Sequence, residues 1–247
     1  MGDAFWASPF FVLTKWFVYA FLLNNFIVFV IIRIVILIVR FTFEGLLIMS
    51  IKIEMNSNNI ITEIFKEHNF TETEKDFILP KFKKVELKKG AIILQENEVV
   101  RDQYFVLDGC LRTYFIDVSG KEFTLQFAIN DWWISDYTAF FSTTKAILNI
   151  ECIKAATLYK ISRENMEDLY KSFPQLEHLF RKKLENAFAS FQKRILSNLA
   201  QSAQERYLSF IETYPNIEQH IKNYHIASYL GITTESLSRI RKKMASK

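Results

Sequence analysis

One glycine between two short amphipathic segments near the end of the chain constrains the fold more than any other feature. Residues 221–230 carry their apolar side chains at helical spacing, and Gly231 follows directly. Glycine adopts positive φ without steric cost, so it can end a helix in a tight turn. Thr233 then provides an N-cap for a second amphipathic segment over 234–244. The end of the chain is therefore predicted to form two helices joined by a short turn.

The second of these helices presents polar and basic side chains on the face away from its apolar residues. Arginine can form two hydrogen bonds with guanine, and glutamate can accept from cytosine N4, so this face suits the major groove of DNA. The basic end, including Arg241 and Lys247, suits phosphates. A solvated helix end, where cations suit the helix dipole, is the alternative. The predicted DNA-binding residues are Thr233, Thr234, Glu235, Ser238, Arg239, Lys242 and Lys243.

Residues 82–162 alternate between apolar and polar and are interrupted by turn signals, which predicts β structure. Turns are expected at 89–90 and 119–120, and the Asp108-Gly109 pair predicts a hairpin. Short strands with regular turns are typical of a barrel or roll. Five aromatic residues are expected to fill its interior, with a pocket for an apolar or planar ligand as the alternative. They are Trp132, Trp133, Tyr137, Phe140 and Phe141.

A long apolar stripe at spacings of three and four follows Pro174 and predicts a helix. Such a stripe suits a coiled-coil seam as well as packing on the chain's own barrel, and we prefer the dimer. Basic residues off the stripe, such as Arg194, are expected to lie in solvent. The predicted dimerisation residues are Leu176, Phe180, Leu184, Phe188, Phe191 and Ile195.

From near Asn59 to its end, the chain resembles the Crp/Fnr family of bacterial transcription regulators. Residues 225–242 look like the family's helix-turn-helix, and Leu107-Asp108-Gly109 is similar to a family hairpin. The resemblance implies base contacts by Glu235 and Arg239, whereas Thr234 stands where many members carry an arginine. The implied fold class is α+β with three domains. These are a jelly-roll β-barrel sensor over 56–170, a dimerisation helix over 171–200 and a winged-helix-like helix-turn-helix domain over 201–247.

The resemblance also implies an effector pocket. In the family, a Gly-Glu pair holds a ribose, and an arginine ten residues after the glutamate neutralises a cyclic phosphate; Asp136 and Ala146 occupy these two positions here. A buried phosphate without a cation would be largely unpaired, so binding of cyclic AMP is not expected. Asp136 is kept as a polar contact for an unknown small-molecule effector. The pocket residues are Ser135, Asp136, Tyr137 and Ala146.

Cysteine and histidine usage argues against a cofactor or a metal. Cys110 and Cys152 are too few to ligate the iron–sulfur cluster used by one branch of the resembled family. The histidines, at 68, 178, 220 and 225, are scattered along the chain. None of the common catalytic motifs occurs, so no enzyme activity is predicted.

The partners expected from these features are DNA and a second copy of the chain. The formal net charge is only +4, but the cations concentrate at the C-terminal end. A homodimer bound to an inverted-repeat operator in double-stranded DNA is predicted, with RNA polymerase as an optional further partner. The alternative function is a ligand-binding or membrane-anchored signalling protein whose helix-turn-helix mediates protein contacts.

Residues 1–48 form a separate apolar block. Residues 16–39 contain one charged residue, Arg33, and are long enough as a helix to cross a bilayer. An inner-membrane anchor with the C-terminal side in the cytoplasm is one interpretation. The interpretation that we prefer is a cytoplasmic protein whose translation starts at Met49 or Met55, so that a membrane is a partner only if residues 1–48 are translated.

Overall fold

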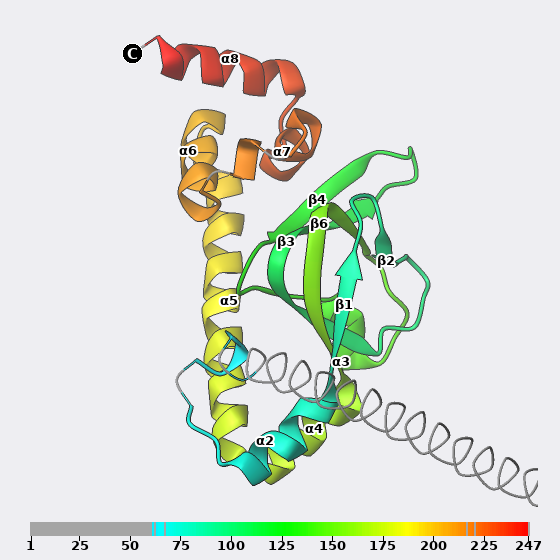
Figure 1. Cartoon of the computed structure of the whole chain (residues 1–247). Coiled ribbons are helices and arrows are strands. Elements are labelled where there is room, and N and C mark those ends of the chain that lie inside the picture. Colours follow the sequence, from blue (N-terminus) through cyan, green and yellow to red (C-terminus); the bar gives the residue numbers. More distant parts are fainter. Residues whose placement is uncertain (1–60, 62, 67, 216, 220, 247) are drawn as a thin grey trace, which may run out of the picture. The chain divides into compact units, whose positions relative to one another are not determined.

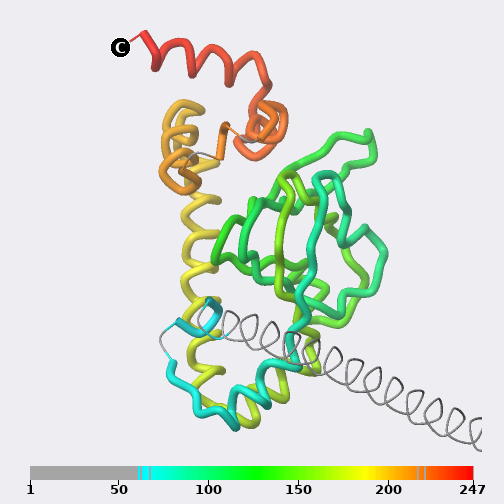
Figure 2. Tube along the Cα trace, in the orientation of Figure 1, coloured from blue at the N-terminus to red at the C-terminus, as the bar shows by residue number. Residues whose placement is uncertain are grey.

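The computed structural model describes residue 61 and residues 63–66, 68–215, 217–219 and 221–246 (Figure 1 and Figure 2). The apolar block 1–48, the starts at Met49 and Met55, and the expected residues His220 and Lys247 lie outside these residues. Within the described part of the chain, no helix is both long enough and apolar enough to cross a membrane.

The β structure predicted over 82–162 is an antiparallel sheet that forms a roll. β6 and β3 pair along most of their length, β1 and β2 pair with β6, and β4 and β5 pair with β3 (Figure 1). The jelly-roll-like fold class is confirmed. The strands are β1 (Phe82–Leu87), β2 (Ile92–Leu94), β3 (Asp102–Ile116), β4 (Glu122–Ala128), β5 (Trp133–Ile134) and β6 (Asn149–Ser162).

The hairpin predicted at Asp108-Gly109 is wrong. β3 continues through Gly109 as one long strand, and its register with β6 shifts on either side of this residue. Gly109 has φ of 106°, and a Cβ there would lie 2.5 Å from the backbone oxygen of Ala155. The glycine therefore permits a bulge and a close approach between two strands rather than a reversal of the chain.

Helices flank the roll and complete the C-terminal part of the chain (Figure 1). α5 begins at Pro174, whose fixed φ suits the first turn of a helix. Ser202 caps α6 in a reciprocal pair with Glu205, so a new helix begins directly after α5 ends. The helices are α2 (Glu72–Ile78), α3 (Tyr137–Ser142), α4 (Arg163–Ser172), α5 (Pro174–Ala200), α6 (Ala203–Thr213), α7 (Asn223–Leu230) and α8 (Thr234–Ala245), with 3-10 turns η1 (Leu79–Lys81) and η2 (Ile217–Gln219).

Three apolar cores hold these elements together. One fills the roll, and a second lies where α2 and α4 meet the start of α5. The third joins the roll to α6, α7 and α8, which we call the C-terminal head: Phe127 of β4 lies with its ring centroid 6.0 Å from that of Phe210 and 5.7 Å from that of Tyr214. The head is thus packed against the roll as well as tethered to it through α5.

The start of the apolar stripe on α5 is used inside the chain. Leu176 is 0% exposed, and Phe180 packs against Trp133 with ring centroids 5.1 Å apart. Leu176 therefore belongs to the core of its own chain and is not accessible for the predicted dimer seam, whereas Phe180 is partly buried against this core. The second half of the stripe differs, because Leu184, Phe188 and residues beyond them are exposed.

The aromatic cluster predicted to fill the roll is divided among four places. Phe140 is buried in the roll, whereas Phe141 is exposed. Trp133 packs on α5, and Trp132 lies against Tyr214 of the head with ring centroids 5.4 Å apart. The two tryptophans join the roll to neighbouring helices, which alternation along a strand does not reveal.

Candidate nucleic-acid interface and effector pocket

The turn between α7 and α8 has the geometry expected from its sequence. Gly231 ends α7 with φ of 67° and ψ of 34° in the left-handed region. The Thr233 hydroxyl accepts a hydrogen bond of 3.2 Å from the backbone N–H of Ser236 and so caps α8. Leu237 is fully buried below the turn. These contacts fix which face of α8 points outward.

The outward face of α8 carries the predicted DNA-binding residues. Arg239 donates to Ser236 one turn earlier at 3.2 Å, and Thr234 donates to Glu235 at 3.0 Å, so their described hydrogen bonds stay within α8. The helix end is basic and unpaired with the roll in the described contacts. Of the predicted residues, Thr234 is partly exposed, and the exposed ones are Thr233, Glu235, Ser238, Arg239, Lys242 and Lys243.

Arg241 does not belong to this outward face, contrary to the expectation for the basic end. Its Nε donates to the Tyr207 hydroxyl at 3.0 Å, and its Nη1 donates to Asn223 Oδ1 at 2.6 Å. Its Nη2 lies 3.3 Å from a Glu218 carboxylate oxygen. Arg241 therefore braces α8 against α6, α7 and η2 instead of reaching for a phosphate.

Asp136, kept as the polar contact of the effector pocket, is a structural cap. Its Oδ1 accepts from the Ala139 N–H at 3.2 Å at the start of α3. Its Oδ2 accepts from the N–H groups of Ile147 and Leu148 at 2.8 Å and 3.0 Å. The residue is 0% exposed. Three backbone donors thus bind the carboxylate, and no exposed oxygen remains for a ribose.

The other predicted pocket residues also bond within the chain. Ser135 Oγ donates to the carbonyl of Asp102 at 2.9 Å, and the Tyr137 hydroxyl donates to Gln103 Oε1 at 3.4 Å. Ala146 is buried and apolar. The four predicted residues do come together around α3, but they provide no cation for an anionic ligand.

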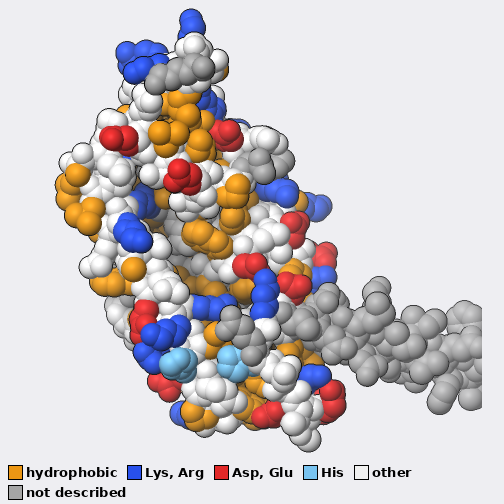
Figure 3. Space-filling view, turned by 90° about the vertical axis from the view of Figure 1, so that its left-hand side faces the viewer, with side chains coloured by type: hydrophobic (Ala, Val, Ile, Leu, Met, Phe, Trp, Pro, Cys, Tyr) orange, Lys and Arg blue, Asp and Glu red, His pale blue; other side chains and the backbone are white. Residues whose placement is uncertain are grey.

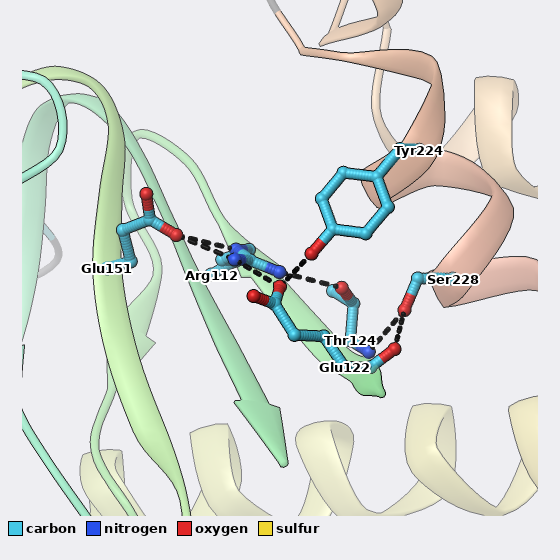
Figure 4. A network of polar contacts seen from close by, with 6 residues as sticks. All are labelled: Arg112, Glu122, Thr124, Glu151, Tyr224 and Ser228. Carbon is cyan, nitrogen blue, oxygen red and sulfur yellow. Dashed lines mark hydrogen bonds and ion pairs between the residues drawn. The ribbon is translucent and has the colours of Figure 1, made fainter. Parts of the chain in front are cut away.

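A polar network between the roll and α7 was not predicted from the sequence (Figure 4). Arg112 of β3 is 2% exposed and pairs with Glu151 of β6 at 2.7 Å and with Glu122 of β4 at 2.6 Å. The Tyr224 hydroxyl of α7 donates to the same Glu122 carboxylate. Burial disfavours the charge of Arg112, but the two glutamates outweigh it and raise its pKa. The only local signal was a charged residue in an alternating strand.

Backbone groups of β4 complete this contact. The Ser228 hydroxyl of α7 accepts from the Thr124 N–H at 2.9 Å and donates to the Glu122 carbonyl at 2.8 Å. Arg194 of α5, expected in solvent, donates to the carbonyls of Thr124 and Tyr229 at 3.2 Å and 3.3 Å. Because β4 has a strand partner on one side only among the described strands, these side chains satisfy polar groups on its outer edge.

The chain has detectable relatives among known proteins. A sequence model described as the cyclic nucleotide-binding domain matches residues 84–173. The regulatory protein HlyX of Actinobacillus pleuropneumoniae is 25% identical over 194 residues, which are 70% of this chain and 75% of HlyX. The transcriptional activator protein Anr of Pseudomonas protegens is 20% identical over 62% of this chain and 67% of its own length.

Solved structures share the fold. A Eubacterium rectale protein assigned to the Crp/Fnr family has a TM-score of 0.57 at 22% identity, over 72% of this chain and 84% of its own. FixK2 from Bradyrhizobium japonicum has a TM-score of 0.60 at 18% identity, over 67% of this chain and 85% of its own. The matched domain agrees with the roll described above, and the chain is similar to regulatory proteins and, in its fold, to a protein assigned to the Crp/Fnr family.

Proposed function

We propose that this regulator binds DNA in a sequence-specific manner through α8. The observation that carries the proposal is the fixed, outward face of α8, on which Glu235 and Arg239 stand one turn apart and Lys242 and Lys243 follow. Arginine and glutamate can read base edges in the major groove, whereas lysines near the helix end bind phosphates of any sequence. The Crp/Fnr relatives support the same conclusion.

The DNA-bound form is proposed to be a homodimer formed through α5. Its apolar stripe is exposed beyond the region that packs on the roll, and Figure 3 shows hydrophobic side chains on the face of the molecule that carries α5. A helix face this apolar is unfavourable in water and suits a seam with an identical helix. The exposed stripe consists of Leu184, Phe188, Phe191, Ile195, Leu196 and Leu199.

The effector is proposed not to be a cyclic nucleotide. In the segment that corresponds to the family's nucleotide cassette, the Asp136 carboxylate already accepts the N–H groups of Ile147 and Leu148. To hold a ribose, Asp136 would have to release these N–H groups, and the cyclic phosphate would meet Ala146 in place of a cation. Since both features oppose the binding of a cyclic nucleotide, the pocket favours a neutral ligand or none.

The test of DNA binding is a selection from random duplexes at fixed salt concentration, followed by affinity measurements. Arg239→Ala should relax the preference at one base pair, at a cost of about 1–3 kcal/mol for the selected site. Lys243→Ala should weaken binding to all sequences about equally and reduce the dependence of affinity on salt. Glu235→Ala should relax a second base pair. If no duplex is enriched and neither basic variant changes retention on DNA, the proposal is wrong.

A further inference from the structure

The contact between the head and the roll has two parts that lie side by side. The apolar part places Phe127 of β4 among Phe210, Tyr214 and Tyr229 of the head. The polar part is the network of Figure 4, in which α7 reaches β4 through the Tyr224 and Ser228 side chains. The head is therefore held in one position by specific contacts and does not hang freely from α5.

The charges at this contact place a negatively charged hydrogen-bond acceptor on the roll. Arg112 is the one cation between two carboxylates, so the cluster of Arg112, Glu122 and Glu151 carries one excess negative charge toward α7. Burial raises the pKa of Glu122, but its bonds with Tyr224 and Arg112 outweigh burial and lower that pKa. The carboxylate that meets α7 is therefore ionised at neutral pH.

The start of α7 is also the part that would meet the DNA backbone. In a helix-turn-helix, the second helix enters the major groove while the first crosses the backbone, and helix N-termini favour phosphate. The N-cap residue of α7, Lys222, makes no side-chain hydrogen bond to the first N–H groups of the helix. Tyr224 lies in the first turn of α7. The Glu122 carboxylate accepts the hydrogen bond of the Tyr224 hydroxyl, which is then not available to a phosphate oxygen. The negative charge of the carboxylate also repels the phosphate.

We propose that Glu122 acts as an internal competitor of the DNA backbone, which holds α7 against the roll and keeps the head from DNA until the contact opens. This inference rests on the proposed DNA binding. Signals that alter the β3–β4 pairing would open or close the contact, because Arg112 and Glu122 lie on these two strands. The Glu122 carboxylate and a DNA phosphate are thus two acceptors that compete for the same donor on α7, the Tyr224 hydroxyl.

The test compares Glu122→Gln with Glu151→Gln in the full chain. Both variants remove one negative charge and leave Arg112 one carboxylate, but only Glu122 contacts α7. At equal salt concentration, Glu122→Gln is expected to bind a duplex of fixed sequence about fivefold more tightly than Glu151→Gln, since bonds to charged acceptors are stronger than bonds to neutral ones. Amide exchange at Thr124, whose N–H binds Ser228, should accelerate by a similar factor.

The outcomes separate this inference from the proposed function. Tighter DNA binding together with faster Thr124 exchange in Glu122→Gln supports the competition. Equal DNA affinities of the two variants overturn it, whatever the absolute affinity. Unchanged Thr124 exchange also overturns it, and this readout needs no DNA. If wild type and both variants fail to bind any duplex, the proposed function itself fails and the competition fails with it.

Discussion

At the residue scale, the protonation of His225 is coupled to the position of the head. It is 8% exposed at the contact between α7 and the roll, and its Nδ1 has no hydrogen-bond partner. Burial, followed by the nearby charge of Arg112, lowers its pKa from 6.5 to about 4. Glu151 and Glu122 oppose this shift, and Lys222 adds to it. The docked head therefore holds His225 in its neutral form.

Mild acid is expected to release the head. Because the pKa of His225 is lowered in the docked form, docking is fully stable above pH 6.5 and loses stability as the pH falls from 6.5 toward 4. Between pH 7.5 and 5.5 the docking equilibrium should weaken roughly tenfold, and Thr124 amide exchange, corrected for its intrinsic pH dependence, reports this change. His225→Gln should show no such pH dependence over this range. A wild-type response equal to that of His225→Gln would contradict the assignment.

Gly109 is the residue at which one methyl group decides the pairing of β3 with β6. Gly109→Ala should destabilise the chain by about 2–4 kcal/mol, because it adds strain at positive φ to a backbone clash. Gly120→Ala is the matched control, since Gly120 has φ of 81° but nothing lies within 4 Å of an added Cβ. That control should cost about 1 kcal/mol from strain alone. Denaturant unfolding of both variants measures the difference, and equal losses would contradict the proposed close approach.

At the scale of elements, the two halves of α5 differ in what they contact. Its first turns pack on the roll through Leu176 and Phe180, and its later turns expose an apolar stripe. Arg194 of the same helix also bonds to β4 and α7. A shift of α5 in the proposed seam between two copies would therefore also alter the contact between head and roll, because the same helix takes part in both.

Phe188→Glu is expected to separate the proposed dimer. The side chain is 62% exposed in the single chain, and a carboxylate in an apolar seam would be desolvated twice, once for each copy. The dissociation constant should rise at least about 100-fold, as for a central interface residue. Sedimentation velocity across a concentration series measures it. Asn186→Glu, an exposed change off the stripe, is the control, and equal effects of the two changes would exclude this seam.

At the scale of the whole molecule, a two-fold dimer would make the spacing of the operator a property of the protein. Two recognition helices on one face of DNA read half-sites about 10 base pairs apart, centre to centre. Inserting about 5 base pairs between half-sites turns one of them to the opposite face, so affinity should fall at least tenfold toward that of a single half-site. Fluorescence anisotropy at fixed salt concentration measures this fall. An unchanged affinity would indicate that the chain binds DNA as a monomer.

Local patterns in the sequence were sufficient where neighbours along the chain decide the structure. The turn at Gly231, the cap at Thr233 and the long helix after Pro174 were all predicted, because capping, φ preference and helical periodicity act over a few residues. Local patterns failed at Gly109. A bulge and a hairpin use the same Asp-Gly pair, and only the strand on the other side distinguishes them.

The sequence alone determined the class of fold, the order of the elements and the outward face of α8, since these depend on short-range spacing and on the resemblance to a family. Only the tertiary structure decided that Asp136 is a cap, that Arg241 is a brace and that Glu122 joins β4 to α7. Each of these side chains is polar and capable of binding a ligand. Which partner it takes depends on residues distant in sequence. Burial then stabilises that pairing, because an unpaired polar group away from water is unfavourable.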